Sequence, residues 1–93
     1  MKTIYKYPLQ LCSEQIIIMP LNAQILSVQW VRGSICIYAL VDSESDGEPR
    51  RFEIFGTGHP VPPQDVFTER DFLGTVVSND QELVFHVYER RWL

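Results

Sequence analysis

Apolar and polar residues alternate along much of this chain, and a period of two indicates β-strands with one buried face. The alternation is clearest in residues 24–31. Residues 35–41 are instead apolar on both faces, which is typical of a strand in the middle of a sheet. Gly33 lies between these two segments and can take the positive φ of a tight turn. The pattern therefore predicts a β-hairpin over residues 24–41.

Two shorter segments before this hairpin also have the composition of strands. Residues 3–8 alternate and end at a proline, which together with Lys6 favours an edge position, because both residues deter further pairing. Residues 14–19 are rich in β-branched side chains and end just before Pro20. A helix is the alternative for residues 14–19, but three consecutive isoleucines so close to a proline disfavour it. We therefore expect two strands.

The middle of the chain is predicted to form an acidic loop and then another strand. Residues 42–49 contain acidic, small and polar side chains. Asp42, Glu44 and Asp46 are spaced two apart and could imitate a calcium loop, but the glycine and distal glutamate spacing of an EF-hand is missing. A solvated hairpin loop is therefore favoured. Residues 52–55 follow as a strand, which we expect to pair with the strand before the loop.

The last third of the chain is predicted to hold an irregular segment and a second hairpin. Residues 61–71 contain prolines and lack a clear period, which is typical of a long functional or flexible loop. Residues 72–77 and 82–88 alternate on either side of a short polar turn, and residues 89–93 are expected to form a tail. These elements predict one all-β domain, residues 1–93. Its architecture is expected to be a small antiparallel sandwich or a partly open barrel built from hairpins.

Composition and charge narrow the functional classes. The chain has a net charge of −4, which argues against broad nucleic-acid binding, because such binding needs a basic field over the whole footprint. No apolar run approaches the roughly 18 residues of a membrane span, and the first residues lack the apolar region of a signal peptide. The two cysteines fit neither a disulfide framework nor a zinc site. We therefore expect a cytoplasmic protein whose partners are neither nucleic acids nor membranes.

The turn at residues 56–60, Gly-Thr-Gly-His-Pro, concentrates the features most suited to a binding site. Its glycines permit backbone angles closed to other residues and its proline fixes φ, so we expect at least one of the glycines to have positive φ. Such a turn presents backbone N–H groups and polar side chains from one small patch, next to an arginine and several aromatic residues. The candidate ligand-binding residues are Arg51, Phe55, Gly56, Thr57, Gly58 and His59.

Simpler interpretations compete with this one. Turn chemistry alone explains the glycines, since the Walker lysine and the longer dinucleotide fingerprint are missing, and His59 could be a cap of nearby backbone. His86 fits a half-buried strand histidine and Cys36 a small core residue. Arg50 and Arg51 should point to opposite faces, so we do not expect both to serve one phosphate. No spacing predicts a metal site, a cofactor or a catalytic residue partnering His59, and we expect no enzyme.

Three stretches together resemble a known family. They are the opening residues 1–9, the segment Ile-Phe-Gly-Thr-Gly-His-Pro at residues 54–60 and the segment Leu-Val-Phe-His-Val-Tyr-Glu at residues 83–89. The chain is similar over nearly its whole length to a family of small uncharacterised proteins of tailed phages and prophages. The resemblance implies an accessory protein that acts in a bacterial cytoplasm. Phage accessory proteins of this size often counter host defence, some by sequestering nucleotide-derived signals, and that function is extended here by analogy.

Three hypotheses of function follow. The first is a binder that sequesters a small anionic, nucleotide-derived molecule without chemistry, with its pocket at a subunit interface of a homo-oligomer because so small a domain encloses little space. The second is a protein-interaction module that inhibits a host protein through an exposed sheet edge and the acidic residues 42–48. The third, a hydrolase using His59, is the weakest, because no nucleophile lies at a catalytic spacing.

Overall fold

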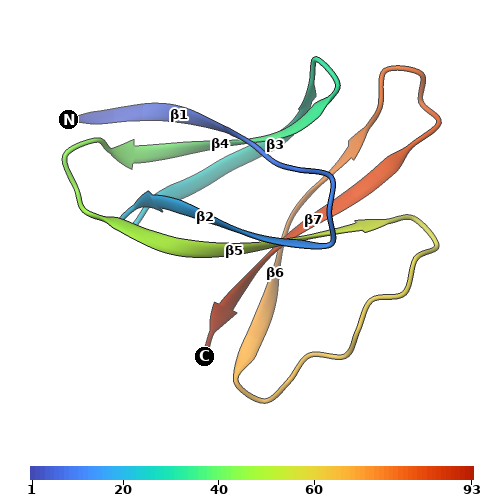
Figure 1. Ribbon diagram of the computed structural model, residues 1–93. Helices are drawn as coiled ribbons and strands as arrows, with labels where there is room; N and C mark the ends of the chain where they lie inside the picture. The colour runs from blue at the N-terminus through green and yellow to red at the C-terminus, as the bar shows by residue number, and fades with distance from the viewer.

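A computed structural model describes all 93 residues as two β-sheets packed face to face, without a helix. The three-stranded sheet has the order β1-β4-β3 and the four-stranded sheet the order β2-β5-β7-β6, all neighbours being antiparallel (Figure 1). No helix is present that could cross a lipid bilayer. The all-β prediction is confirmed, and the sheets form an open sandwich that does not close into a barrel. The strands are β1 (Lys2–Pro8), β2 (Glu14–Pro20), β3 (Gln24–Val31), β4 (Ser34–Asp42), β5 (Gly47–Gly56), β6 (Thr68–Val77) and β7 (Val84–Trp92).

The core lies between the two sheets and consists of the residues that alternation places on their facing sides. Met19, Ile37, Phe52 and Val87 each come from a different strand and are fully buried. Burial of these apolar side chains away from water is the main favourable contribution to the stability of the sandwich. Cys36 is also buried, as predicted for a small core residue.

Several local predictions are confirmed. Strands β3 and β4 form the expected hairpin, with Gly33 at φ +83° in its turn, and β4 lies in the middle of its sheet. Strand β1 lies at a sheet edge. Glu14–Pro20 is a strand and not a helix, because its apolar side chains alternate between an exposed and a buried face. Strands β6 and β7 form the second hairpin.

The partner predicted for residues 52–55 is wrong. Strand β5 pairs with β2 and β7, whereas β4 belongs to the other sheet. The chain changes sheets after β4, and the acidic loop is shorter than predicted because β5 already begins at Gly47. Local periodicity fixes which residues form a strand, but not which sheet the strand joins.

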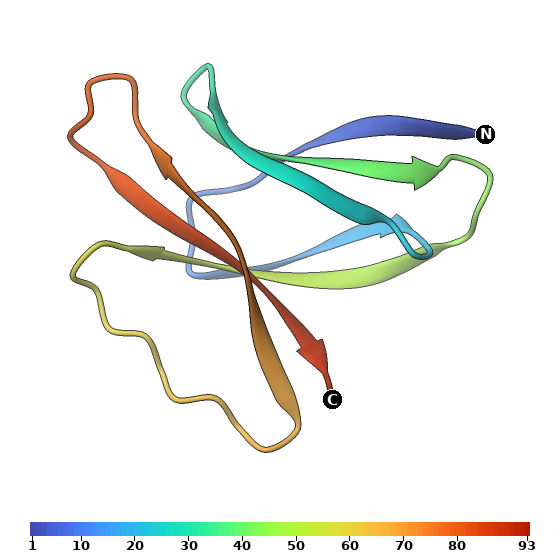
Figure 2. The ribbon, with the colours of Figure 1, turned by 180° about the vertical axis from the view of Figure 1, so that it is seen from behind.

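Two boundaries in the last third are also wrong. Residues 68–71, assigned to the irregular loop, belong to β6, and residues 89–92, assigned to a tail, belong to β7. The two stretches pair with each other, and Arg91 of β7 forms ion pairs with Glu69 directly opposite and with Asp71 on the diagonal. Oppositely charged cross-strand pairs stabilise a sheet even where apolar residues do not alternate. The sequence prediction relied on apolar alternation and therefore missed these ends of the two strands. The paired ends extend away from the three-stranded sheet (Figure 2).

Candidate functional site

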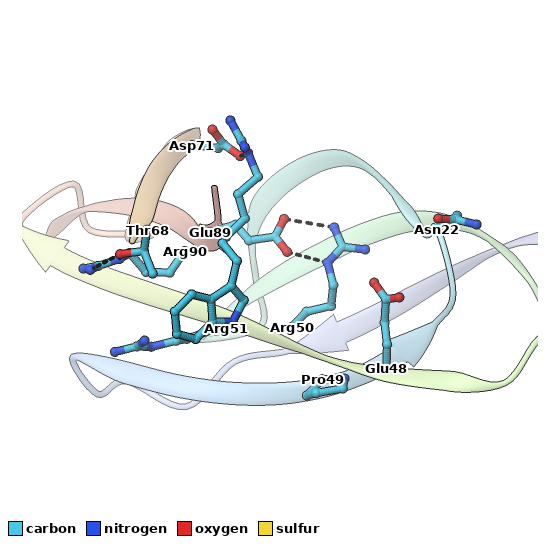
Figure 3. Close-up of a pocket in the computed structure, with 11 residues that line it drawn as sticks. Asn22, Glu48, Pro49, Arg50, Arg51, Thr68, Asp71, Glu89 and Arg90 are labelled. Carbon is cyan, nitrogen blue, oxygen red and sulfur yellow. Dashed lines mark hydrogen bonds and ion pairs between the residues drawn. The ribbon is translucent and has the colours of Figure 1, made fainter. Parts of the chain in front are cut away.

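The four-stranded sheet splits where β5 and β7 separate. Their pairing ends at Arg51 opposite Arg90, after which β5 continues along β2 and β7 continues along β6. We call this split the fork. It holds the largest hollow in the molecule, of about 470 Å³, and polar side chains dominate its walls (Figure 3). The lining residues are Asn22, Glu48, Pro49, Arg50, Arg51, Thr68, Asp71, Glu89, Arg90, Arg91 and Trp92.

Pro49 accounts for the split. In the β5–β7 register the odd residues of β5 form the hydrogen-bonded pairs, because Thr57 N–H donates to the Val84 carbonyl at 3.2 Å. The next such pair beyond Arg51 and Arg90 would join Pro49 to Trp92. Proline has no N–H to donate, so the ladder ends there and the strands diverge.

Two of the four arginines at the fork are held in buried ion pairs. The guanidinium of Arg50 forms a two-point contact with the Glu89 carboxylate, and its Nη1 donates to the Ala23 carbonyl at 2.9 Å (Figure 3). The bond to Glu89 raises the pKa of Arg50 above its ordinary value. Arg90 donates to Thr68 Oγ1 at 2.6 Å and lies 3.4 Å from the Glu53 carboxylate. These contacts fix the shape of the fork.

The other two arginines have exposed partners. Arg51 Nε donates to Glu14 Oε1 at 2.8 Å, with 38% and 46% of the two side chains exposed. Arg91 Nε donates to Asp71 Oδ2 at 2.6 Å and its Nη2 donates to Glu69 Oε2 at 2.5 Å, and half of the Arg91 side chain is exposed. The hydrogen bond from Arg51 lowers the pKa of Glu14, and the bond to Asp71 raises the pKa of Arg91. Exposed pairs of this kind contribute only about 0–1 kcal/mol, so both guanidiniums can change partner at little cost.

Trp92 adds an aromatic surface to the fork. Its side chain is 76% exposed although it lines the hollow. An exposed indole beside arginines combines a stacking surface with charged donors, which is the combination that binds nucleotides.

The predicted turn lies elsewhere, at the far end of β5. Gly58 has φ +86°, whereas Gly56 does not have positive φ, so the expectation of at least one such glycine is confirmed. His59 is exposed, with its imidazole against the open side of Gly56. Two smaller hollows, of about 200 and 330 Å³, touch this turn. The turn is therefore a shaped surface without the arginines of the fork.

Two contacts beside the turn assign structural roles. Thr57 Oγ1 lies 2.8 Å from His86 Nε2, and His86 Nδ1 lies 2.9 Å from Thr75 Oγ1, so the half-buried imidazole joins the turn to β6. Phe55 is buried, with the Arg70 guanidinium 5.4 Å from its ring centroid. The His86 imidazole and the Phe55 ring are therefore not free to stack on a ligand.

The structure does not bring the six sequence-predicted residues into one pocket. Gly56, Thr57, Gly58 and His59 share the turn, but Arg51 is five residues upstream on the same strand, about 17 Å away at the rise of a β-strand. Arg50 and Arg51 do belong to opposite faces, yet both line the hollow, because the fork opens to both faces of the sheet.

Sequence reasoning missed the residues of β7 at the fork, because residues 89–93 were assigned to a tail. Two signals could have found them. The pair Arg90-Arg91 repeats the pair Arg50-Arg51, and Tyr88, Arg90 and Trp92 continue the period of two.

Comparison with known proteins gives a family but no activity. Residues 1–92 match a family described as a domain of unknown function, DUF7352. The chain belongs to this family. Searches of the curated proteins and of the solved structures found no significant match. The geometry of the fork is therefore the main basis for assigning a function.

Proposed function

We propose that this protein binds a small anionic, nucleotide-derived molecule at the fork and releases it unchanged. The observation that carries the proposal is the convergence of four arginines from two diverging strands on one hollow, beside an exposed tryptophan, in a chain of net charge −4. Local arginine clusters bind phosphate groups through paired, charge-assisted hydrogen bonds even where the overall charge is negative.

Arg51 and Arg91 would make the direct contacts. Arg51 donates to one exposed carboxylate and Arg91 to two, Asp71 and Glu69, so a phosphate can replace these partners without uncovering a buried charge. Arg50 and Arg90 would keep their buried partners and supply positive potential behind the ligand. A base would stack on Trp92, where one ring face of an exposed indole can contribute about 1–3 kcal/mol.

The same walls favour binding over catalysis. The Glu89 carboxylate is occupied by Arg50. The Thr68 hydroxyl accepts from Arg90 and donates to Asp65 Oδ1 at 2.9 Å, and the same oxygen accepts from the Phe67 and Thr68 N–H groups. A nucleophile needs a base that can take its proton, and the Phe67 N–H, which lowers the pKa of Asp65, makes this carboxylate a weak base. This arrangement supports a ligand that is held without being cleaved.

The resemblance to phage and prophage proteins supports a biological setting for such binding. A phage protein that sequesters a nucleotide-derived signal in the bacterial cytoplasm would blunt a defence system that depends on that signal. A binder acts in this way through mass action alone, so it needs affinity and copy number and no turnover.

Thermal shift and calorimetry against inorganic phosphate, AMP, ADP-ribose and a cyclic dinucleotide test the proposal. A nucleotide at a hundred times its Kd should add about 2.7 kcal/mol of stability, which raises Tm by about 10 °C or more in a domain of this size. Arg51→Ala and Arg91→Ala should each weaken binding about ten- to a hundredfold, since a charge-assisted hydrogen bond contributes about 1.5–3 kcal/mol. Both variants should melt near the wild-type Tm, because their ion pairs are exposed.

The matched control is Arg32→Ala, which removes the same charge from an exposed turn outside the fork. It should bind like the wild type. The proposal fails if no nucleotide shifts Tm, or if Arg51→Ala and Arg91→Ala bind as well as the Arg32→Ala control. Recovery of a cleaved ligand after incubation would overturn the claim that the ligand leaves unchanged.

A further inference from the structure

The sandwich has four edge strands, and three of them carry features that prevent pairing with another chain. Strand β1 contains two lysines and ends at a proline, β3 has a register shift between Ile25 and Ser27, and β6 has one between Phe72 and Gly74 together with charged residues. Lysine, proline and bulges are the usual protections of exposed edges. Strand β2 also ends at a proline, but it has a regular register from Glu14 to Pro20 and no lysine, arginine or bulge.

The backbone groups that β2 leaves unpaired can be identified from its ladder. Ile54 N–H donates to the Ser13 carbonyl at 3.2 Å, and Leu21 N–H donates to the Asp46 carbonyl at 2.8 Å. Both bonds follow the β2–β5 register, so the odd residues of β2 bond to β5. The N–H and C=O groups of the even residues, Glu14, Ile16 and Ile18, therefore point to the free edge.

The side chains of the same residues are unusually apolar for an open edge. Ile16 and Ile18 are 64% and 62% exposed, side by side on the outer face of the sheet. Ile17 lies between them on the inner face and packs against the core. A flat strand of β-branched residues with free backbone groups is a template for pairing with another strand.

We propose that β2 pairs antiparallel with β2 of a second copy of this chain, about a two-fold axis through Ile17. In this register Ile16 lies opposite Ile18 of the second copy, and these residues exchange both of their backbone hydrogen bonds. Glu14 N–H meets the carbonyl of Pro20, whose missing N–H costs nothing at the end of the ladder. The two four-stranded sheets become one continuous sheet.

The self-complementary pattern of β2 is the reason for choosing a second copy as the occupant. About Ile17 the apolar side chains are symmetric, so four exposed isoleucines form one cross-strand cluster on the outer face. Moving the register by two residues towards the N-terminus places the charged Glu14 opposite Ile18 and loses this match. Isologous pairing of one patch with itself is the commonest arrangement of protein dimers. This inference does not rest on the proposed ligand.

Sedimentation equilibrium over a concentration series tests the dimer. The wild type should associate, and the double variant Ile16→Lys/Ile18→Lys should be monomeric, because the new charges face each other across the edge. The matched control Ile4→Lys/Leu26→Lys adds the same charge at exposed isoleucine and leucine positions of the other sheet and should still associate. A wild type that is monomeric throughout, or an Ile16→Lys/Ile18→Lys variant that still associates, overturns the proposal.

Disulfide trapping tests the register. In a Cys12→Ser background, Ile17→Cys should link to its own copy, because a non-hydrogen-bonded pair on the axis brings Cα atoms to about 4.5 Å, within the range of a disulfide. Ile4→Cys on β1 is the control and should not link. A dimer in which Ile17→Cys fails to link refutes the two-fold axis at Ile17. A monomer that captures a host protein through β2, and loses it in the Ile16→Lys/Ile18→Lys variant, assigns the edge to a foreign strand instead.

Discussion

Replacing Glu14 with glutamine should tighten the binding of an anionic ligand at the fork. Glu14 accepts a hydrogen bond from Arg51 at 2.8 Å, and both side chains are more than a third exposed. A ligand phosphate must take the place of this carboxylate. Removing the carboxylate charge therefore frees Arg51 for the ligand and raises the affinity. If the ion pair were purely structural and Arg51 did not contact the ligand, the affinity would not change.

The size of the effect follows from the exposure of the pair. An exposed ion pair contributes about 0.2–1 kcal/mol, which corresponds to an affinity gain of about 1.5- to fivefold. The same competition predicts a pH dependence. The hydrogen bond from Arg51 holds the pKa of Glu14 below its ordinary 4.5. The ion pair between Glu14 and Arg51 therefore persists above pH 4.5 and is lost as the pH falls through the lowered pKa. Wild-type affinity should rise there towards that of Glu14→Gln.

Isothermal titration with a phosphodiester ligand is the appropriate assay, because a phosphodiester group stays ionised from neutral pH down through the lowered pKa of Glu14. The matched control is Glu82→Gln, which removes the same charge from an exposed loop at the opposite end of β7, where the Glu82 side chain makes no ion pair. If Glu14→Gln binds no better than Glu82→Gln, or if its affinity changes with acid as the wild-type affinity does, then Arg51 does not contact the ligand.

Three further outcomes concern the scaffold. Glu53→Gln should lower the free energy of unfolding by about 3 kcal/mol and Tm by more than about 10 °C in a thermal melt, because it removes the counter-charge of two buried arginines. Gly58→Ala should cost about 1 kcal/mol in a denaturant titration because its φ is +86°, and Gly56→Ala should cost less because its Cβ displaces only an exposed histidine ring. The pKa of Asp65 is lowered by N–H donors of its own loop, so wild-type Tm should fall as the pH drops through that pKa. Asp65→Asn should show a smaller fall, because only the contribution of Asp65 is removed and other carboxyl groups with lowered pKa values remain.

The sequence was sufficient to predict the elements that depend on local pattern. The hairpin of β3 and β4 follows from alternation, from a central run that is apolar on both faces and from Gly33 in the turn. The strand at Glu14–Pro20 follows from β-branched side chains before a proline. These signals act over a few residues, so a single chain displays them fully.

The pairing of β5 and the position of the fork could not be predicted in the same way. Nothing local in residues 52–55 specifies β2 and β7 as their neighbours, because that choice depends on how the whole chain crosses between sheets. The charged ends of β6 and β7 are stabilised by each other and look like loop and tail when taken singly. The sequence indicated Arg51 as a charged candidate beside the turn at residues 56–60, but the fold places it beside Arg90 and Arg91 and away from His59.

The fork also suggests why a protein this small can hold a ligand without a deep cavity. Pro49 ends the β5–β7 ladder, so two strands that remain anchored to β2 and β6 diverge and carry arginines on both sides of the gap. Residues in strands lose little further backbone freedom when a ligand binds. The buried ion pair of Arg50 with Glu89 also fixes β5 and β7 at the point where they separate. Preorganisation of this kind reduces the entropic cost of association. Only the side chains of Arg51 and Arg91 must change partner, and these are the two arginines of the fork whose ion-pair partners are all exposed.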